Sequence, residues 1–359
     1  AQNLPPKPGK YAFTTVPDDP TRTRIYKLNN GLTVYLSQNK AEPRIQTYIA
    51  VKAGSKNDPK ETTGLAHYLE HMMFKGTSNI GTTNWSREKM VIDAIAQLYE
   101  QHRNEKDPVK KAAIYKQIDA LSQEAAKFAV PNEYDKMITS LGAKGTNAYT
   151  SKEQTVYVNN VPSNQLENFF NVEAERFRNP QMRLFHTELE AVYEEKNRGL
   201  DNDGRKAYEA MYAGLFPTHP YGTQTTIGTV EHLKNPSLKE IKKFLQTYYV
   251  PNNMVIALSG DFNPDEAIKI IAERFGKMQS KDIPAFVSPQ EKLIKSPVVK
   301  EVFGPDAESI MIGFRFPGAN SPDADVLTMV DMILSNGQAG LLDLNINNSQ
   351  KALGASSTT

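Results

Sequence analysis

The sequence predicts a fold that combines β-strands with α-helices, and three observations support this prediction. Residues 25–39 alternate polar and apolar side chains around Asn30-Gly31, a pair that favours a type I′ hairpin turn. Residues 88–136 are rich in Lys, Glu, Ala and Gln, with apolar residues at helical spacing. Residues 253–262 form an apolar run typical of a buried strand, followed by a helical pattern over residues 263–278.

The remaining elements follow from the same periodicities. We expect further strands at residues 44–54, 142–162 and 308–318, and further helices at residues 62–76, 164–179, 182–203, 237–249 and 323–336. Thr62 or Thr63 is expected to cap the first of these helices, and Gly76 to end it. The stretch 88–136 should form two long helices that break near Asp107-Pro108, because proline cannot continue a helix. The sequence therefore predicts a helical hairpin at the surface.

Composition excludes several classes of function. The chain has 359 residues, of which 39% are hydrophobic and 23% charged, and its formal charge is +1. This balance favours neither nucleic acid nor an anionic membrane as a partner, and no apolar run approaches the roughly 18 residues of a membrane span. The chain contains no cysteine, which excludes disulfides, thiolate metal sites and thiol nucleophiles. Any metal must be bound by His, Asp or Glu.

Proline content and length suggest four segments. The start, AQNLPPKPGK, looks like a mature N-terminus, and we expect residues 1–21 to be extended. Residues 22–276 form the main domain, and residues 277–300, with several Pro, Lys and Ser, form a linker. Residues 301–359 are too few for a second domain of similar size, so we expect an incomplete one and a fragment of a longer protein.

One short apolar segment carries two imidazoles and a carboxylate. His67 and His71 are four residues apart, so a helix places them on one face, one turn apart. Two such imidazoles can bind one metal ion, and zinc is the usual choice for histidine and carboxylate ligands. Glu70 lies on the same side, where it could take a proton from a metal-bound water. Two structural histidines are the alternative, but a carboxylate on an apolar helix face is costly without a partner.

The segment His67-Tyr68-Leu69-Glu70-His71 is the inverted zinc motif H-x-x-E-H. Its setting, GLAHYLEHMMFKGT, resembles the pitrilysin/insulinase family of zinc metallopeptidases, which includes the mitochondrial processing peptidases. The resemblance continues in GTNAYTSKEQTVY, FPTHPYGTQTTIGT and YYVPNNMVIALSGDF. It covers roughly residues 22–275 and becomes faint after residue 300.

The resemblance implies a third zinc ligand, a glutamate on a later helix with another acidic residue seven positions before it. ELEAVYEEKN matches this pattern with Glu195 as the ligand and Glu188 as the earlier carboxylate. A spacing of seven puts both on one helical face. Glu188 would orient a ligand or the water, whereas Glu190 and Glu194 fit a solvated acidic face.

The interval between the second histidine and the expected third ligand is unusually long. Glu195 lies 124 residues after His71, which is longer than the family's usual interval. The excess is close to the length of the hairpin at 88–136, and an inserted surface hairpin would leave the metal site intact.

Asn147 and Ala148 resemble the family's edge strand, which pairs with the peptide substrate through backbone hydrogen bonds. An ordinary strand entry is the alternative for these two residues.

The resemblance implies an α+β fold: a mostly antiparallel sheet packed with helices, carrying the inserted hairpin and followed by a truncated second domain of similar type. It implies a zinc endopeptidase that binds one Zn²⁺ per chain and cleaves peptides or unfolded protein segments, with Glu70 as the general base. The alternatives are a non-catalytic scaffold subunit, or a half-enzyme that needs its C-terminal half or a partner subunit. Resemblance to exported bacterial members implies a periplasmic or secreted location.

Overall fold

A seven-stranded mixed sheet organises the larger of two compact units in the computed structural model, which describes residues 11–359. The units are Ala1–Ala307 and Glu308–Thr359. The strand order is β1-β2-β3-β7-β4-β6-β5, and every neighbouring pair is antiparallel except β3 and β7, which run parallel. The strands are β1 Phe13–Thr14, β2 Arg24–Lys27, β3 Thr33–Gln38, β4 Arg44–Val51, β5 Lys144–Thr150, β6 Thr155–Pro162 and β7 Met254–Gly260. The expected α+β class with a mostly antiparallel sheet is confirmed.

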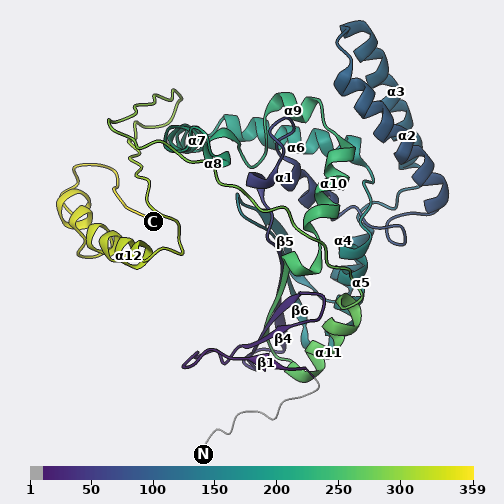
Figure 1. Cartoon of the computed structure of the whole chain (residues 1–359), viewed down its shortest axis with the longest axis horizontal. Helices are drawn as coiled ribbons and strands as arrows, with labels where there is room; N and C mark the ends of the chain where they lie inside the picture. The colour runs from purple at the N-terminus through teal and green to yellow at the C-terminus, as the bar shows by residue number, and fades with distance from the viewer. Residues whose placement is uncertain (1–10) are drawn as a thin grey trace, which may run out of the picture. The chain divides into compact units, whose positions relative to one another are not determined.

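Helices cover the sheet, and two of them form a separate pair (Figure 1). Helices α5 and α11 pack on each other and on the sheet, while α1 contacts β5 and β6. The helices of the larger unit are α1 Leu65–Met72, α2 Trp85–Asn104, α3 Pro108–Ala126, α4 Glu133–Ser140, α5 Leu166–Arg178, α6 Phe185–Leu200, α7 Asp203–Leu215, α8 Pro220–Thr223, α9 Val230–Lys234, α10 Leu238–Tyr248 and α11 Pro264–Phe275.

The core lies between the central strands and these helices because the strands alternate buried and exposed side chains. In β4, Ile45, Ile49 and Val51 are fully buried, and Ile256 and Leu258 of the adjacent β7 join the same cluster. Burying an aliphatic side chain of this size contributes about 1.5–3 kcal/mol. The apolar pattern of the sequence therefore fixes which face of the sheet receives the helices.

The expected helical hairpin is confirmed: α2 and α3 pack side by side (Figure 1). The break falls at the predicted dipeptide, because Pro108 is the first residue of α3 and the Asp107 carboxylate accepts the N–H groups of Val109 and Lys110. Such a cap contributes about 1 kcal/mol to a helix.

The expected type I′ turn between β2 and β3 is wrong. Gly31 has a positive φ of 86°, but Asn30 does not, and the Gly31 N–H donates to the Leu28 carbonyl. The Asn30 amide instead donates to the carbonyls of Phe275 and Met278 at 2.9 and 3.1 Å. The asparagine therefore ties the hairpin to the end of α11 rather than shaping a two-residue turn.

The smaller unit contains α12 Asp323–Leu334, at the expected place, and a π-helical turn at Asp343–Asn347. The strand expected at residues 308–318 is absent, and Ile310 is 90% exposed there. The apolar run finds no neighbouring strand in this unit, and a strand without a partner leaves its backbone groups unpaired. Residues 279–297 have no helix or strand, and the four segment boundaries remain predictions.

The first ten residues of the extended start expected at 1–21 lie outside the described residues. Within the part of the chain that the structure describes, no helix combines the length and apolar character needed to cross a membrane.

Candidate metal centre

Helix α1 carries the H-x-x-E-H segment, and the face of α1 opposite the two histidines is buried. The expected cap at Thr62 or Thr63 is wrong, because the N-cap residue of α1 is Gly64, which has a φ of 88°. The Asp58 carboxylate performs the capping role and accepts the N–H groups of Gly64 and Ala66 at 2.7 and 3.0 Å. Core contacts on the buried face come from Leu65, Ala66, Tyr68, Leu69 and Met72. The two histidines are thereby left on the side that faces the pocket.

Arg183 connects the turn after α1 to the start of α6. Its guanidinium makes five hydrogen bonds of 2.6–2.9 Å: two to the Glu88 carboxylate and three to the carbonyls of Lys75, Thr77 and Ile80. These use all five of its N–H donors. Arg183 and Glu88 are both buried, at 1% and 0% exposure. The buried hydrogen bonds thus tie together the two helices that carry the candidate ligands.

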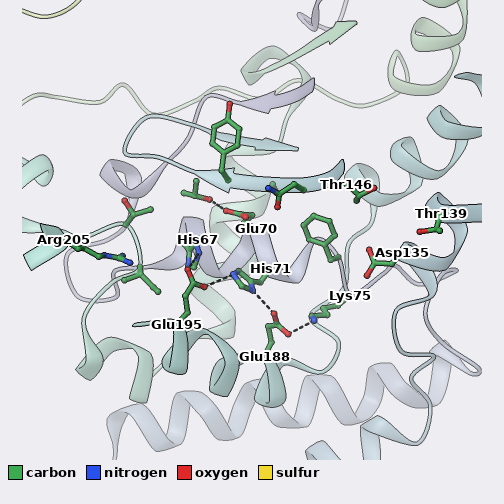
Figure 2. Close-up of a pocket in the computed structure, with 17 residues that line it drawn as sticks. His67, Glu70, His71, Lys75, Asp135, Thr139, Thr146, Glu188, Glu195 and Arg205 are labelled. Atoms are coloured by element: carbon green, nitrogen blue, oxygen red, sulfur yellow. Dashed lines mark hydrogen bonds and ion pairs between the residues drawn. The ribbon is translucent and has the colours of Figure 1, made fainter. Parts of the chain in front are cut away.

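The two imidazoles and one carboxylate converge in the pocket between α1 and α6 (Figure 2). Nε2 of His67 lies 3.6 Å from Glu195 Oε1, and Nε2 of His71 lies 3.5 Å from Glu195 Oε2. One potential ligand atom from each residue falls within 4.8 Å of the others. Two ligands at about 2.0–2.1 Å from a tetrahedral zinc are about 3.4 Å apart. The spacing therefore fits a single zinc ion.

Glu188 and Lys75 orient the second imidazole. The Glu188 carboxylate lies 2.7 Å from His71 Nδ1 and 2.5 Å from Lys75 Nζ (Figure 2). Burial opposes the charged form of His71, but the bond to Glu188 and the nearby carboxylates raise its pKa above the ordinary value. Burial likewise opposes the charge of Glu188, and His71 and Lys75 outweigh it and lower the pKa of that carboxyl. With Nδ1–H donated to Glu188, the Nε2 lone pair of His71 is free to bind a metal.

His67 is held in its neutral form. Burial, together with the charges of His71 and Arg205, lowers the pKa of His67 to about 3. Its Nδ1 is buried and makes no hydrogen bond among the described residues. A neutral imidazole is the form that binds metal, so the donor set of two imidazoles and one carboxylate fits zinc.

Glu70 lies beside this set without belonging to it. Its side chain is 8% exposed, and one oxygen accepts a 2.5 Å hydrogen bond from the Thr150 hydroxyl on β5. Burial raises the pKa of Glu70 above its ordinary value, while the bond from Thr150 and the charge of His71 act in the opposite direction. A carboxyl with a raised pKa next to a metal centre is suited to accept and return a proton near neutral pH.

A cavity of about 890 Å³ opens over these residues and reaches β5. Asn147 and Ala148 line it, together with Thr146, Tyr149 and Thr150. β5 is the last strand of the sheet and pairs only with β6 among the described strands. Asn147 is the fourth residue of β5 and follows a register irregularity after Lys144. The strand therefore presents an open edge above the candidate metal ligands.

The structure brings all seven predicted site residues to one cavity, which is lined by His67, Glu70, His71, Asn147, Ala148, Glu188 and Glu195. Glu190 and Glu194 lie on the same helix but are exposed and do not line it, as the expected solvated face requires.

Two sequence profiles of one peptidase family together match most of the chain. "Insulinase (Peptidase family M16)" matches residues 33–88 and 120–225, and "Peptidase M16 inactive domain" matches residues 236–359. The chain belongs to the insulinase family, M16. The first match is interrupted over residues 89–119, which lie in the α2–α3 hairpin.

Curated M16 relatives are distant and longer. The chain is 25% identical over 324 residues to "Zinc protease PqqE" of Helicobacter pylori, covering 88% of this chain and 61% of the relative. It is 25% identical over 280 residues to "Probable mitochondrial-processing peptidase subunit beta" of Schizosaccharomyces pombe, covering 77% and 49%. The mouse "Insulin-degrading enzyme" is 24% identical over 276 residues, of which the chain covers 22%. The chain thus spans less than two thirds of the length of each of these relatives.

Solved M16 structures share the fold. A protease from Helicobacter pylori superposes with a TM-score of 0.57 at 24% identity, covering 75% of this chain and 54% of that one. The periplasmic protease PqqL from Escherichia coli gives a TM-score of 0.58 at 20% identity, covering 77% and 26%.

The residues of this M16 pocket that sequence reasoning missed include Lys75, Thr150 and Arg205. Lys75 lies four positions after His71, but α1 ends at Met72, so Lys75 reaches the pocket from the turn after the helix. Thr150 lies two positions after Ala148, and strand alternation puts both on one face. Arg205 lies on α7, just beyond the helix expected at residues 182–203, and no local pattern marks it.

Proposed function

We propose that this chain is the zinc-binding part of a metalloendopeptidase that hydrolyses peptides or unfolded protein segments. One observation carries the proposal: the convergence of His67 Nε2, His71 Nε2 and the Glu195 carboxylate, with Glu70 beside them. His67, His71 and Glu195 would hold one Zn²⁺. When bound, zinc would acidify a water and polarise the peptide carbonyl.

The remaining chemistry belongs to the protein. Glu70 accepts the proton of the attacking water and passes it to the leaving amine, while the Thr150 hydroxyl holds one of its oxygens. Glu188 keeps the Nδ1 proton on His71 and so directs Nε2 into the pocket. Glu188 is thus a positioning residue, and Lys75 balances its charge.

The substrate segment binds extended along β5. The strand's open edge offers backbone groups at Asn147 and Ala148, directly above the candidate ligands. An added strand pairs through main-chain hydrogen bonds, so it accepts many sequences. This supports peptides and unfolded segments as substrates, because a folded protein cannot present an extended strand to the pocket.

A half-enzyme is the second candidate, favoured by the share of the relatives that the chain covers. It spans 49% of the mitochondrial processing peptidase relative, itself described as a subunit, and 61% of the Helicobacter pylori zinc protease. Full activity would then need a C-terminal half or a partner subunit. The complete donor set argues against a non-catalytic scaffold. A periplasmic location is supported by the description of PqqL.

Elemental analysis of the purified chain tests the metal site. We expect about one zinc per chain in the parent and a large loss in Glu195→Ala. Glu194→Ala is the matched control, because Glu194 is the adjacent residue and its side chain is 71% exposed. Absence of zinc from the parent after zinc is supplied, or equal loss in both variants, would refute the ligand set.

A hydrolysis assay tests the base and separates the two candidates. Glu70→Gln should retain zinc but lose at least about 10²-fold in the rate of cleaving an unstructured quenched peptide. Equal rates for this variant and the parent would refute the role of Glu70. A gain in rate when the C-terminal half is supplied supports the half-enzyme, and no gain counts against it.

A further inference from the structure

Arg205 brings a positive charge to the cavity from α7. It lines the same cavity as the candidate ligands and lies at one end of the row of side chains in Figure 2. Its positive charge contributes to the lowered pKa of His67, although burial and the charge of His71 contribute more. On the other side of the view the cavity is lined by both Asp135 and Lys75.

The backbone of α6 leaves room for this guanidinium. Gly199 lies four residues after Glu195 and has no side chain at the point where Arg205 crosses the helix. A Cβ at Gly199 would lie 2.8 Å from Arg205 Nη1 and 3.1 Å from Cζ, closer than side chains normally approach. The glycine therefore lets the arginine lie against α6, one helical turn from the candidate zinc ligand.

The guanidinium has unused donors. Nε of Arg205 lies 3.4 Å from Glu209 Oε1, a long ion pair on the same helix. Among the described residues, neither Nη1 nor Nη2 has a hydrogen-bond acceptor within bonding distance. The side chain is 37% exposed, so these donors are accessible. By contrast, two carboxylates of the same cavity already have partners: Glu70 has Thr150, and Glu188 has His71 and Lys75.

We propose that Arg205 binds a carboxylate of the peptide substrate, either an Asp or Glu side chain or the C-terminal α-carboxylate. The planar fork of an arginine matches a carboxylate through two parallel hydrogen bonds. Glu209 holds Nε and leaves the Nη1–Nη2 end directed to the ligand. The inference rests on the proposed peptidase function and specifies its substrate class.

A binding experiment tests this without turnover. The chain with Glu70→Gln, loaded with zinc, is titrated into fluorescein-labelled unstructured peptides followed by fluorescence anisotropy. One series carries a single Glu at successive positions of a neutral sequence, or Gln in its place. Each peptide is made with a free and with an amidated C-terminus, which separates the two sources of carboxylate. We expect at least one Glu position, or the free terminus, to bind about 10-fold more tightly than its neutral counterpart.

Matched variants assign the effect to Arg205. Arg205→Met should abolish the carboxylate preference, so that the Glu and Gln peptides bind with equal affinity. Arg198→Met makes the same change in charge at a side chain that is 83% exposed and does not line the cavity, and it should keep the preference. Gly199→Ala should weaken the preference by displacing the guanidinium. Added salt should also reduce it.

The outcomes separate this inference from the proposed function. Neutral peptides that bind with no preference for any carboxylate, or a preference that survives Arg205→Met, would overturn the inference and leave the peptidase proposal standing. Failure of the zinc-loaded chain to bind any peptide would overturn both. Loss of zinc from Arg205→Met would assign the residue to the metal site instead.

Discussion

Replacing Arg183 with methionine should lower the free energy of unfolding of the larger unit by about 3–5 kcal/mol. The change removes five buried hydrogen bonds and leaves the Glu88 carboxylate, at 0% exposure, without its cation. Hydrogen bonds to charged groups contribute about 1.5–3 kcal/mol. Breaking a buried ion pair from one side typically costs about 3–5 kcal/mol, because the remaining charge is unpaired.

Urea unfolding followed by circular dichroism measures this loss, with Arg198→Met as the surface control, for which we expect a change within about 0.5 kcal/mol. The double variant Glu88→Gln/Arg183→Met should recover part of the stability, since it removes the unpaired charge. It should not recover all of it, because the carbonyls of Lys75, Thr77 and Ile80 still lack donors. A loss below about 1 kcal/mol in the single variant, or a double variant no more stable than the single one, contradicts this reasoning.

Three further predictions follow from contacts around α1. Glu188→Gln should weaken zinc binding by about 10–100-fold, because His71 loses its orienting carboxylate; a chelator competition titration that finds unchanged affinity would count against it. Asp58→Ala should destabilise the fold by about 1–2 kcal/mol through loss of the helix cap, and Asp58→Asn by less, as urea unfolding can check. Burial lowers the pKa of His232, whose Nδ1 accepts the Thr63 N–H, so the folded state favours the neutral ring. Its contribution to stability should therefore fall as pH drops below about 6.5. Melting temperatures at pH 7.5 and 5.5 should differ less for His232→Gln than for the parent, and equal differences would refute the assignment.

Local spacing was enough to predict two of the three candidate zinc ligands. His67 and His71 belong to one helical turn, so their proximity follows from helix geometry alone. Glu195 comes from a helix more than a hundred residues later. Spacing by itself did not decide which of several glutamates on α6 is the third ligand. Family resemblance selected Glu195 and Glu188, and the structure brings both to the two histidines.

Contacts between distant segments were beyond sequence reasoning. The Thr150 hydroxyl reaches Glu70 because β5 crosses above α1, and no local pattern records that crossing. The strand expected at residues 308–318 fails for a related reason: alternation and apolar content indicate a potential strand, but a partner decides whether one forms. The Asn30-Gly31 signal located the hairpin correctly, yet the contact of Asn30 with the end of α11 changed its turn.

The position of β7 in the sheet constrains the order in which the protein can assemble. β3 and β4 are neighbours in sequence but are separated in the sheet by β7, which spans Met254–Gly260. During synthesis both strands therefore wait for more than two hundred further residues before their facing edges can be paired, and such late, non-local pairing slows folding. A chain shortened before Met254 would carry two open strand edges, the feature that promotes aggregation. The segment from Met254 to Gly260 thus acts as a closing strand, on which completion of the sheet depends even though it contributes no side chain to the candidate metal site.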